Sequence, residues 1–113
     1  MTRTAWRASL EAQNLVLRVL KAEMQDRVGI SLAWYDVLLH LHEAPGGRLR
    51  MNELADSLVL SRSWLTRRIE GMEKAGLVRR DRVRDDARGI VASLTPEGRR
   101  VYGRAARLHR EAA

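Results

Sequence analysis

The sequence predicts one mainly α-helical domain with a small antiparallel β-hairpin. Its 113 residues, 45% hydrophobic and 31% charged, suit a single compact core. Apolar residues recur at helical spacing along most of the chain, and one short stretch has the pattern of a hairpin. Because the sequence has no cysteine and no apolar run near the roughly 18 residues of a membrane span, we expect a cytoplasmic protein without thiol chemistry.

The positive charge is confined to one half of the chain. Residues 1–60 hold seven basic and seven acidic side chains. Residues 61–113 hold fourteen basic and seven acidic ones, and so carry the whole formal net charge of +7. Such a one-sided field suits a polyanion, either a nucleic acid or an anionic membrane surface. A basic face that is only solvated is the alternative.

Two helices are predicted before the first strong break. Residues 6–27 contain neither proline nor glycine and have an apolar surface wider than one stripe, which favours either a deeply buried helix or a subunit interface. Ser31 is placed to cap a second helix that runs to about residue 44, where Pro-Gly-Gly at 45–47 ends it. The two apolar stripes of the first helix are formed by Leu10, Leu17, Leu20 and Met24, and by Ala12, Leu15, Val16 and Val19.

The next segments have the lengths of a helix-turn-helix. A strand-like link at 48–50 leads into a helix over 51–58, a turn at 59–60, and a helix from 62 to about 75 that Ser61 caps. At about 100° per residue, one face of the last helix is apolar and turned inward. Its other face mixes small hydroxyls with basic side chains, which suits a reader of base edges in the major groove of DNA. The members of that face are Ser63, Thr66, Arg67, Glu70 and Lys74.

A basic hairpin is predicted directly after this candidate recognition helix. It covers residues 77–94, with a polar turn at 85–89. Arginines at this place can follow the DNA phosphates or enter the minor groove, so the hairpin is predicted to be a wing. Arg82 and Arg84 lie along it, and Arg88, near the tip, is the best candidate for insertion.

A fifth helix is predicted after the hairpin, and five short motifs occur in order between the second helix and this one. Thr95 is its cap and Pro96 its first residue. The motifs are Met51-x-Glu53-Leu54-Ala55, Ser61-x-Ser63-x-Leu65-Thr66-Arg67, Met72-Glu73-x-x-Gly76-Leu77-Val78-x-Arg80, Asp86-x-Arg88 and Leu94-Thr95-Pro96-Glu97-Gly98. Together they resemble the winged helix-turn-helix of the MarR family. The resemblance implies a homodimeric transcriptional regulator of a bacterium or archaeon, which binds a pseudo-palindromic operator in double-stranded DNA and is associated with the nucleoid when bound.

The resemblance also implies roles for single residues. Arg88 matches the wing arginine that enters the minor groove, and Asp86 matches an acidic residue that orients wing or recognition-helix arginines. Ala87 departs from the family pattern, where a further arginine is usual; Arg62 and Arg68 are extra charges that can compensate. Positions that contact phosphates or base edges are matched by Ser61, Ser63, Thr66 and Arg67.

Dimerisation is assigned by the resemblance to the two ends of the chain. We expect residues 1–30 to form a dimerisation or core helix, 31–95 the DNA-binding domain, and 96–113 the start of a C-terminal dimerisation helix. Family members usually continue through a sixth helix, so this C-terminal part is short. A truncated chain, a chain given only as far as its ordered part, and a short member that dimerises through its first helix remain the alternatives.

Many members of the family respond to small aromatic molecules bound between the DNA-binding lobe and the dimerisation helices. Trp34 and Tyr35, together with Trp6, are the candidates for lining such an effector pocket, because flat amphipathic rings favour stacking. Core and interface packing explains them equally well. With five aromatic residues and no phenylalanine, a large aromatic cage is not expected.

The function predicted from these observations is a DNA-binding regulator, and a repressor rather than an activator, because occluding an operator needs no further protein surface. Two alternatives remain: a winged-helix module for protein contacts, and a nonspecific architectural DNA binder. Salt dependence combined with sequence preference separates the three.

No enzyme, cofactor or membrane partner is predicted, because no catalytic or phosphate-loop motif occurs. His40 and His42 point apart on one helix and cannot chelate one metal ion. A site shared between subunits, with Glu43 and His109, is the alternative to ordinary polar positions.

Overall fold

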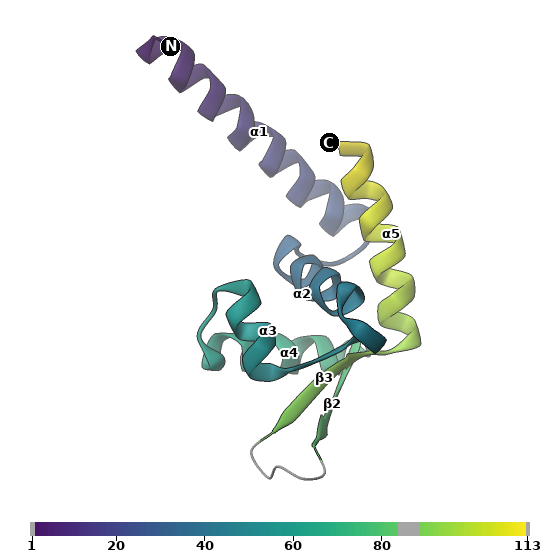
Figure 1. Ribbon diagram of the computed structural model, residues 1–113. Coiled ribbons are helices and arrows are strands. Elements are labelled where there is room, and N and C mark those ends of the chain that lie inside the picture. Colours follow the sequence, from purple (N-terminus) through teal and green to yellow (C-terminus); the bar gives the residue numbers. More distant parts are fainter. Residues whose placement is uncertain (1, 84–88, 113) are drawn as a thin grey trace.

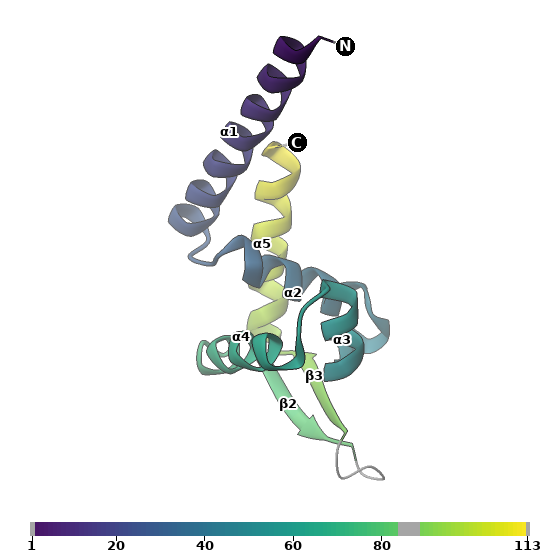
Figure 2. The ribbon, with the colours of Figure 1, turned by 90° about the vertical axis from the view of Figure 1, so that its left-hand side faces the viewer.

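The molecule is elongated, because two helices leave its body at one end and a hairpin leaves it at the other (Figures 1 and 2). The computed structural model describes residues 2–83 and 89–112, with extents of 57 × 28 × 23 Å. Over this part of the chain the elements are α1 (Arg3–Arg27), α2 (Leu32–Glu43), the short 3-10 helix η1 (Pro45–Gly47), β1 (Arg48–Arg50), α3 (Met51–Leu58), α4 (Arg62–Lys74), β2 (Val78–Arg82), β3 (Ile90–Leu94) and α5 (Pro96–Ala112). This is the mainly helical winged helix-turn-helix that the sequence predicts.

Side-chain caps fix where several helices begin. The Ser31 hydroxyl accepts a hydrogen bond from the Trp34 amide at 3.1 Å, as predicted for the start of α2. At the start of α1, the Thr2 hydroxyl accepts from the Ala5 amide at 3.1 Å. Because of this cap, α1 begins at Arg3, three residues before the predicted start at Trp6.

The core lies where α2 packs against α3, α5 and the sheet, with α4 packed on α3 and β2. The predicted inward face of α4 is confirmed, because Leu65, Ile69 and Met72 have no exposed surface. Leu38 and Leu41 of α2 are equally buried. This core buries one face of α4 and leaves the opposite face to solvent.

The sheet has one strand more than the predicted hairpin. Its order is β1-β3-β2, and both pairings are antiparallel. The segment predicted as a strand-like link is β1, which pairs with β3 so that Arg48 lies opposite Ser93 and Arg50 opposite Val91. Three residues are too few to show a period, so this strand pairing cannot be predicted from the local sequence.

Close contacts between the end of the sheet and the start of α5 set the direction of this helix. The Thr95 hydroxyl donates to the Gly76 carbonyl at 2.6 Å and accepts from the Gly98 amide at 2.9 Å. The helix then passes so close to the segment between α4 and β2 that a Cβ at Gly98 would overlap the carbonyl oxygen of Leu77. The motif at 94–98 is therefore a structural joint between the sheet and α5.

The first helix is mostly exposed, which corrects one of the two interpretations of its wide apolar surface. Met24 is buried and Leu20 half-buried, whereas Leu10, Val16 and Val19 each expose about half of their surface. In this chain α1 is therefore not a deeply buried helix. No helix in the described ranges has the length and hydropathy needed to cross a membrane.

Candidate nucleic-acid interface

The helix-turn-helix is formed by α3, a short turn and α4. The turn closes when the Leu60 amide donates to the Ala55 carbonyl at 2.9 Å, and it places Val59 in the left-handed region with a φ of 55°. The hairpin of β2 and β3 projects from the body beside α4 (Figure 2). Helix α4 and the hairpin thus lie toward one end of the molecule, and the N-terminus of α1 and the C-terminus of α5 lie toward the other (Figure 1).

The first turn of α4 presents a small polar surface. Ser61 caps the helix by accepting from the Trp64 amide at 3.2 Å, and its hydroxyl lies 3.3 Å from that of Ser63. Both serines are exposed, and so is Arg67 one turn further along. Free helix amides and hydroxyls at a helix N-terminus attract phosphate oxygens. Three of the predicted contact residues therefore lie together on one accessible face.

Arg62 and Thr66 are less accessible than predicted for DNA contacts. Both are half-buried. The Arg62 Nη1 donates to Asn52 Oδ1 at 2.6 Å, and its Nε is buried without a hydrogen-bond partner. The Thr66 hydroxyl donates to the Arg62 carbonyl at 2.8 Å. In this structure Arg62 ties the start of α4 to α3, a role that the sequence did not suggest.

An ion pair connects the end of α4 to the hairpin. Arg80 Nη2 and Nε lie 3.0 and 3.3 Å from Glu73 Oε1, and the Arg80 amide donates to Oε2 at 3.2 Å. These hydrogen bonds from Arg80 outweigh partial burial and hold the pKa of Glu73 below its ordinary value. The pair therefore fixes β2 relative to the recognition helix.

The described part of the wing carries basic side chains on β2. Arg82 is exposed, and Arg79 pairs with Asp81 through an exposed contact of 2.9 Å. The two strands are closed by the Val83 amide, which donates to the Gly89 carbonyl at 2.8 Å. The predicted wing residues Arg84, Asp86 and Arg88, with Ala87, lie outside the described residues.

Trp64 is a surface residue that the sequence analysis missed. Its side chain is 62% exposed, and the Arg67 guanidinium lies 5.4 Å from the centre of its ring. The predicted exposed face of α4 consists of polar residues, and Trp64 is not among them. Helical spacing alone places this large apolar side chain outside the inward face of α4, and that position was the signal for its exposure.

The candidate effector residues have packing partners in this structure. Tyr35 is buried, which raises its pKa, and its ring stacks on Tyr102 at 6.0 Å and on His109 at 5.2 Å. Trp34 packs against α4 at Gly71, where its Cζ2 lies 3.2 Å from the place of an added Cβ. Trp6 belongs to the N-terminal part of α1, and Figure 1 shows that this end of the helix lies far from α2. The effector pocket thus remains a prediction. Within one chain, Trp6 does not lie beside the rings of Trp34 and Tyr35.

The histidines of α2 also have local partners. His40 Nδ1 lies 2.8 Å from the Asp36 carbonyl oxygen, and His42 stacks on Tyr102 at 4.2 Å. Within residues 2–83 and 89–112, no group of three or more His, Cys, Asp or Glu side chains is arranged to hold a metal ion.

Known proteins similar to this chain share both its sequence pattern and its fold. The family model described as MarR family matches residues 28–89. AbsC, a MarR family transcriptional regulator from Streptomyces coelicolor, is 35% identical with a TM-score of 0.87, over 99% of this chain and 77% of AbsC. Sco3205, a MarR family transcriptional regulator from the same organism solved in complex with DNA, is 38% identical with a TM-score of 0.87, over 97% of this chain and 69% of Sco3205.

A more distant structure has the same fold. A mutant MarR from Escherichia coli, complexed with operator DNA, is 23% identical with a TM-score of 0.78, over 97% of this chain and 80% of that one. No curated protein sequence matches the chain. The family model, the two Streptomyces structures and the arrangement of α3, α4 and the wing agree: the chain is a winged helix-turn-helix transcriptional regulator that belongs to the MarR family.

Proposed function

We propose that this chain represses transcription by binding a pseudo-palindromic operator as a homodimer. In this proposal α4 enters the major groove and the wing follows the neighbouring backbone and minor groove. The observation that carries it is the accessible face of α4, where Ser61, Ser63 and Arg67 lie at the end of the molecule that also carries the hairpin. The structure of Sco3205, solved in complex with DNA, supports DNA as the ligand of this chain.

The roles proposed for the side chains follow their accessibility. Arg67 is free to reach a guanine edge or a phosphate, and the two serines allow close approach to the backbone. Arg62 is half-buried against Asn52, so its contribution is to hold the start of α4 while any remaining donor faces a phosphate. Arg82, on the described part of the wing, adds charge next to the duplex.

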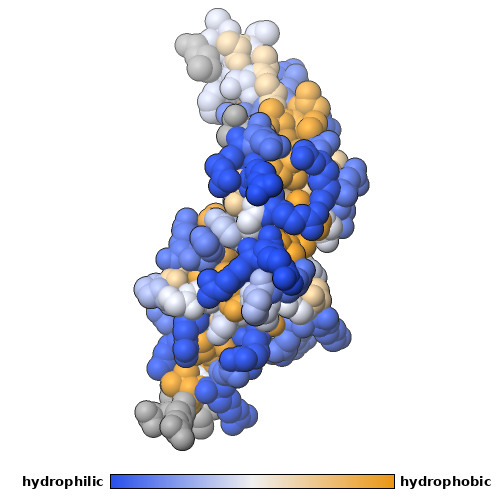
Figure 3. All heavy atoms as spheres, turned by 90° about the vertical axis from the view of Figure 1, so that its right-hand side faces the viewer, coloured by the Kyte–Doolittle hydropathy of each residue, from blue (hydrophilic) through white to orange (hydrophobic). Residues whose placement is uncertain are grey.

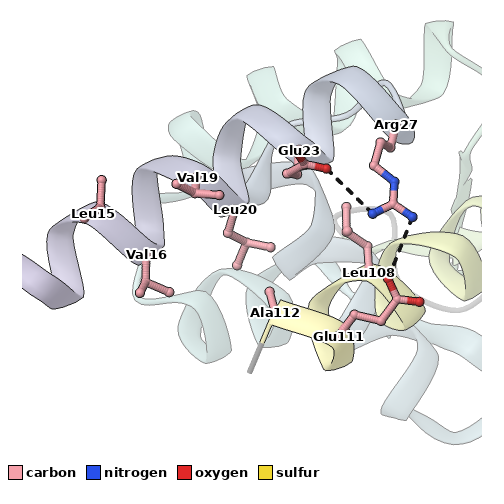
Figure 4. Close-up of a pocket in the computed structure, with 9 residues that line it drawn as sticks. All are labelled: Leu15, Val16, Val19, Leu20, Glu23, Arg27, Leu108, Glu111 and Ala112. Atoms are coloured by element: carbon pink, nitrogen blue, oxygen red, sulfur yellow. Dashed lines mark ion pairs between the residues drawn. The ribbon is translucent and has the colours of Figure 1, made fainter.

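The homodimer is proposed to form through α1 and α5. Apolar side chains on α1 are exposed, and a groove of about 420 Å³ lies between α1 and the end of α5. Figure 4 shows Val16 and Leu20 of α1 pointing to the side on which Leu108 and Ala112 of α5 lie. Leu15 and Val19 also line the groove. A band of apolar atoms between hydrophilic side chains is also visible in the upper half of Figure 3. Exposed apolar surface of this kind favours association.

Polar contacts at the base of the groove keep α1 and α5 together. Arg27 lies 3.6 Å from Glu23 and 3.7 Å from Glu111, which Figure 4 draws as dashed lines. The Arg104 guanidinium donates to the Arg27 carbonyl at 2.7 Å and so caps the end of α1. In the proposed dimer this joint sets the direction of α1, and with it the separation of the two recognition helices.

The proposal divides the chain into a dimerisation helix at 1–30, a DNA-binding domain at 31–95 and the start of a second dimerisation helix at 96–113. It also includes release by a small aromatic effector that contacts Trp34 or Tyr35, and action in the cytoplasm at the nucleoid. The stacked ring of Tyr35 joins α2 to α5, so a ligand inserted there would alter the angle between the DNA-binding domain and the dimerisation helices.

Fluorescence anisotropy tests the proposal with a labelled duplex obtained by selection from a randomised pool, and with a shuffled duplex of the same composition. We expect selective binding that weakens steeply between 50 and 200 mM salt, since phosphate contacts release counterions. A protein-contact module would bind neither duplex. A nonspecific architectural protein would bind both equally with the same salt dependence.

A further inference from the structure

One large aromatic side chain is mostly exposed at the end of the molecule that carries α4 and the hairpin. Trp64 is the third residue of α4 and is 62% exposed. Further along α4, the indole that packs against the helix at Gly71 is that of Trp34 from α2. The groove and the proposed dimer explain why apolar side chains on α1 are exposed. Trp64 lies on a different element and needs a separate explanation.

The neighbour of Trp64 on α4 is Arg67, three residues later and on the same side of the helix. The Arg67 guanidinium lies over the indole ring, 5.4 Å from its centre. This is within the range in which a cation is attracted to the face of an aromatic ring, and tryptophan is the strongest partner of that kind. A cation–π contact uses the charge of the guanidinium and not its N–H donors, which stay available to a ligand.

We propose that Trp64 is a positioning residue for DNA recognition, which holds the Arg67 guanidinium in a direction suited to a base edge or phosphate before the duplex arrives. The inference rests on the proposed function of α4. Its partner is duplex DNA rather than another protein, because the pair lies beside the exposed Ser61 and Ser63 at the positive end of the helix.

Holding Arg67 in place matters because a free arginine loses much side-chain freedom when it binds. A side chain that is already confined loses less, and the difference appears as affinity. An exposed cation–π contact corresponds to about a two- to fivefold change in a binding constant. The effect depends on a π-face: phenylalanine keeps one, whereas leucine supplies apolar bulk without it.

The test is a double-mutant cycle in the full chain, with anisotropy on the selected duplex as the readout. We expect Trp64→Leu to weaken binding about two- to fivefold and Trp64→Phe to stay within about twofold of the wild type. In an Arg67→Ala background, Trp64→Leu should have no further effect, because the group that it positions is absent. Thermal denaturation of each variant is the control. We expect the fold to stay intact, because the substitutions at position 64 are on an exposed side chain.

The outcomes separate this inference from the proposed function. The inference alone fails in two cases in which the wild type binds selectively. In the first, Trp64→Leu has no effect on binding by the otherwise wild-type chain. In the second, Trp64→Leu weakens binding by the same factor in the Arg67→Ala background. Equal losses for Trp64→Phe and Trp64→Leu also overturn the inference, because a π-face would then be irrelevant. If the wild type binds no duplex selectively, the proposed function and the inference fail together.

Discussion

Glu73 at the end of α4 and Arg80 on β2 form an ion pair of 3.0 Å in which the Arg80 amide also takes part. The Arg80 side chain is 26% exposed and that of Glu73 36%, so the pair is partly screened from water. The pair is a direct polar link between α4 and strand β2 of the wing. A substitution that breaks it should therefore alter the position of the wing as well as the stability of the chain.

Glu73→Gln should lower the free energy of unfolding at neutral pH by about 1 kcal/mol, since a partly exposed charged hydrogen bond is worth about that much. Chemical denaturation measures it. The matched control is Asp81→Asn, which breaks the exposed pair with Arg79 and should change stability by less than about 0.5 kcal/mol. Equal losses would show that the Glu73 pair has no special role.

The same pair predicts a pH dependence. The pKa of Glu73 is lowered in the folded chain by the hydrogen bonds from Arg80. Its stabilising contribution is therefore fully present above the ordinary carboxyl pKa and is lost as the pH falls through the lowered value. The stability difference between wild type and Glu73→Gln should shrink in that acidic window and stay constant above it. A difference that persists at acid pH would contradict this assignment.

Gly98→Ala should destabilise the chain by at least about 2 kcal/mol, because the new Cβ would overlap the Leu77 carbonyl and force α5 away from the sheet. Gly103→Ala on the same helix is the control, since nothing lies within 4 Å of its added Cβ. That substitution should stabilise by about 0.5–1 kcal/mol through helix propensity alone. Thermal or urea unfolding separates the two, and similar effects at both positions would refute the close contact.

Val59→Gly should stabilise the chain, although it removes a side chain. Val59 adopts a φ of 55° and is 90% exposed, so it is strained and contributes little packing. Relief of a left-handed conformation is worth about 1 kcal/mol after the added chain entropy is counted. Val59→Ala keeps the strain and should give no comparable gain in urea unfolding. A loss of stability in Val59→Gly would mean that the valine makes a contact that outweighs its strain.

Val16→Asp should weaken the proposed dimer, because it places a charge in the apolar groove between α1 and α5. We expect the dimer dissociation constant to rise at least about tenfold, measured by sedimentation equilibrium. Gln25→Asp adds the same charge nine residues later, on the opposite face of α1, and should leave association unchanged. A monomeric wild type would refute the dimer itself.

The helices could be predicted from the sequence because each has a local signal. Ser31 and Ser61 cap as predicted, and the inward face of α4 follows from helical spacing. Strand β1 acquires its partner from residues about 43 positions later, which no local pattern reveals. Helix α1 begins at Arg3 and not at the predicted Trp6, because the Thr2 hydroxyl caps it by accepting from the Ala5 amide.

The site could be predicted only in part. Ser61, Ser63 and Arg67 lie where their spacing placed them, on an accessible face. The positions of Arg62 and of the pair of Glu73 with Arg80 depend on how α4 packs against α3 and β2, which sequence spacing does not contain. Both members of that pair belong to a recognised motif, yet their joint role became visible only in three dimensions.

Two arginine substitutions, compared by anisotropy, show whether α4 itself reads the duplex. Arg67→Ala removes a charge from the exposed face of α4, and Arg107→Ala removes the same charge from an exposed position on α5. We expect selective affinity to fall at least about tenfold for Arg67→Ala and to stay within about twofold for Arg107→Ala. Equal losses for the two variants would contradict this role of α4, because the duplex would then respond to overall charge and not to α4.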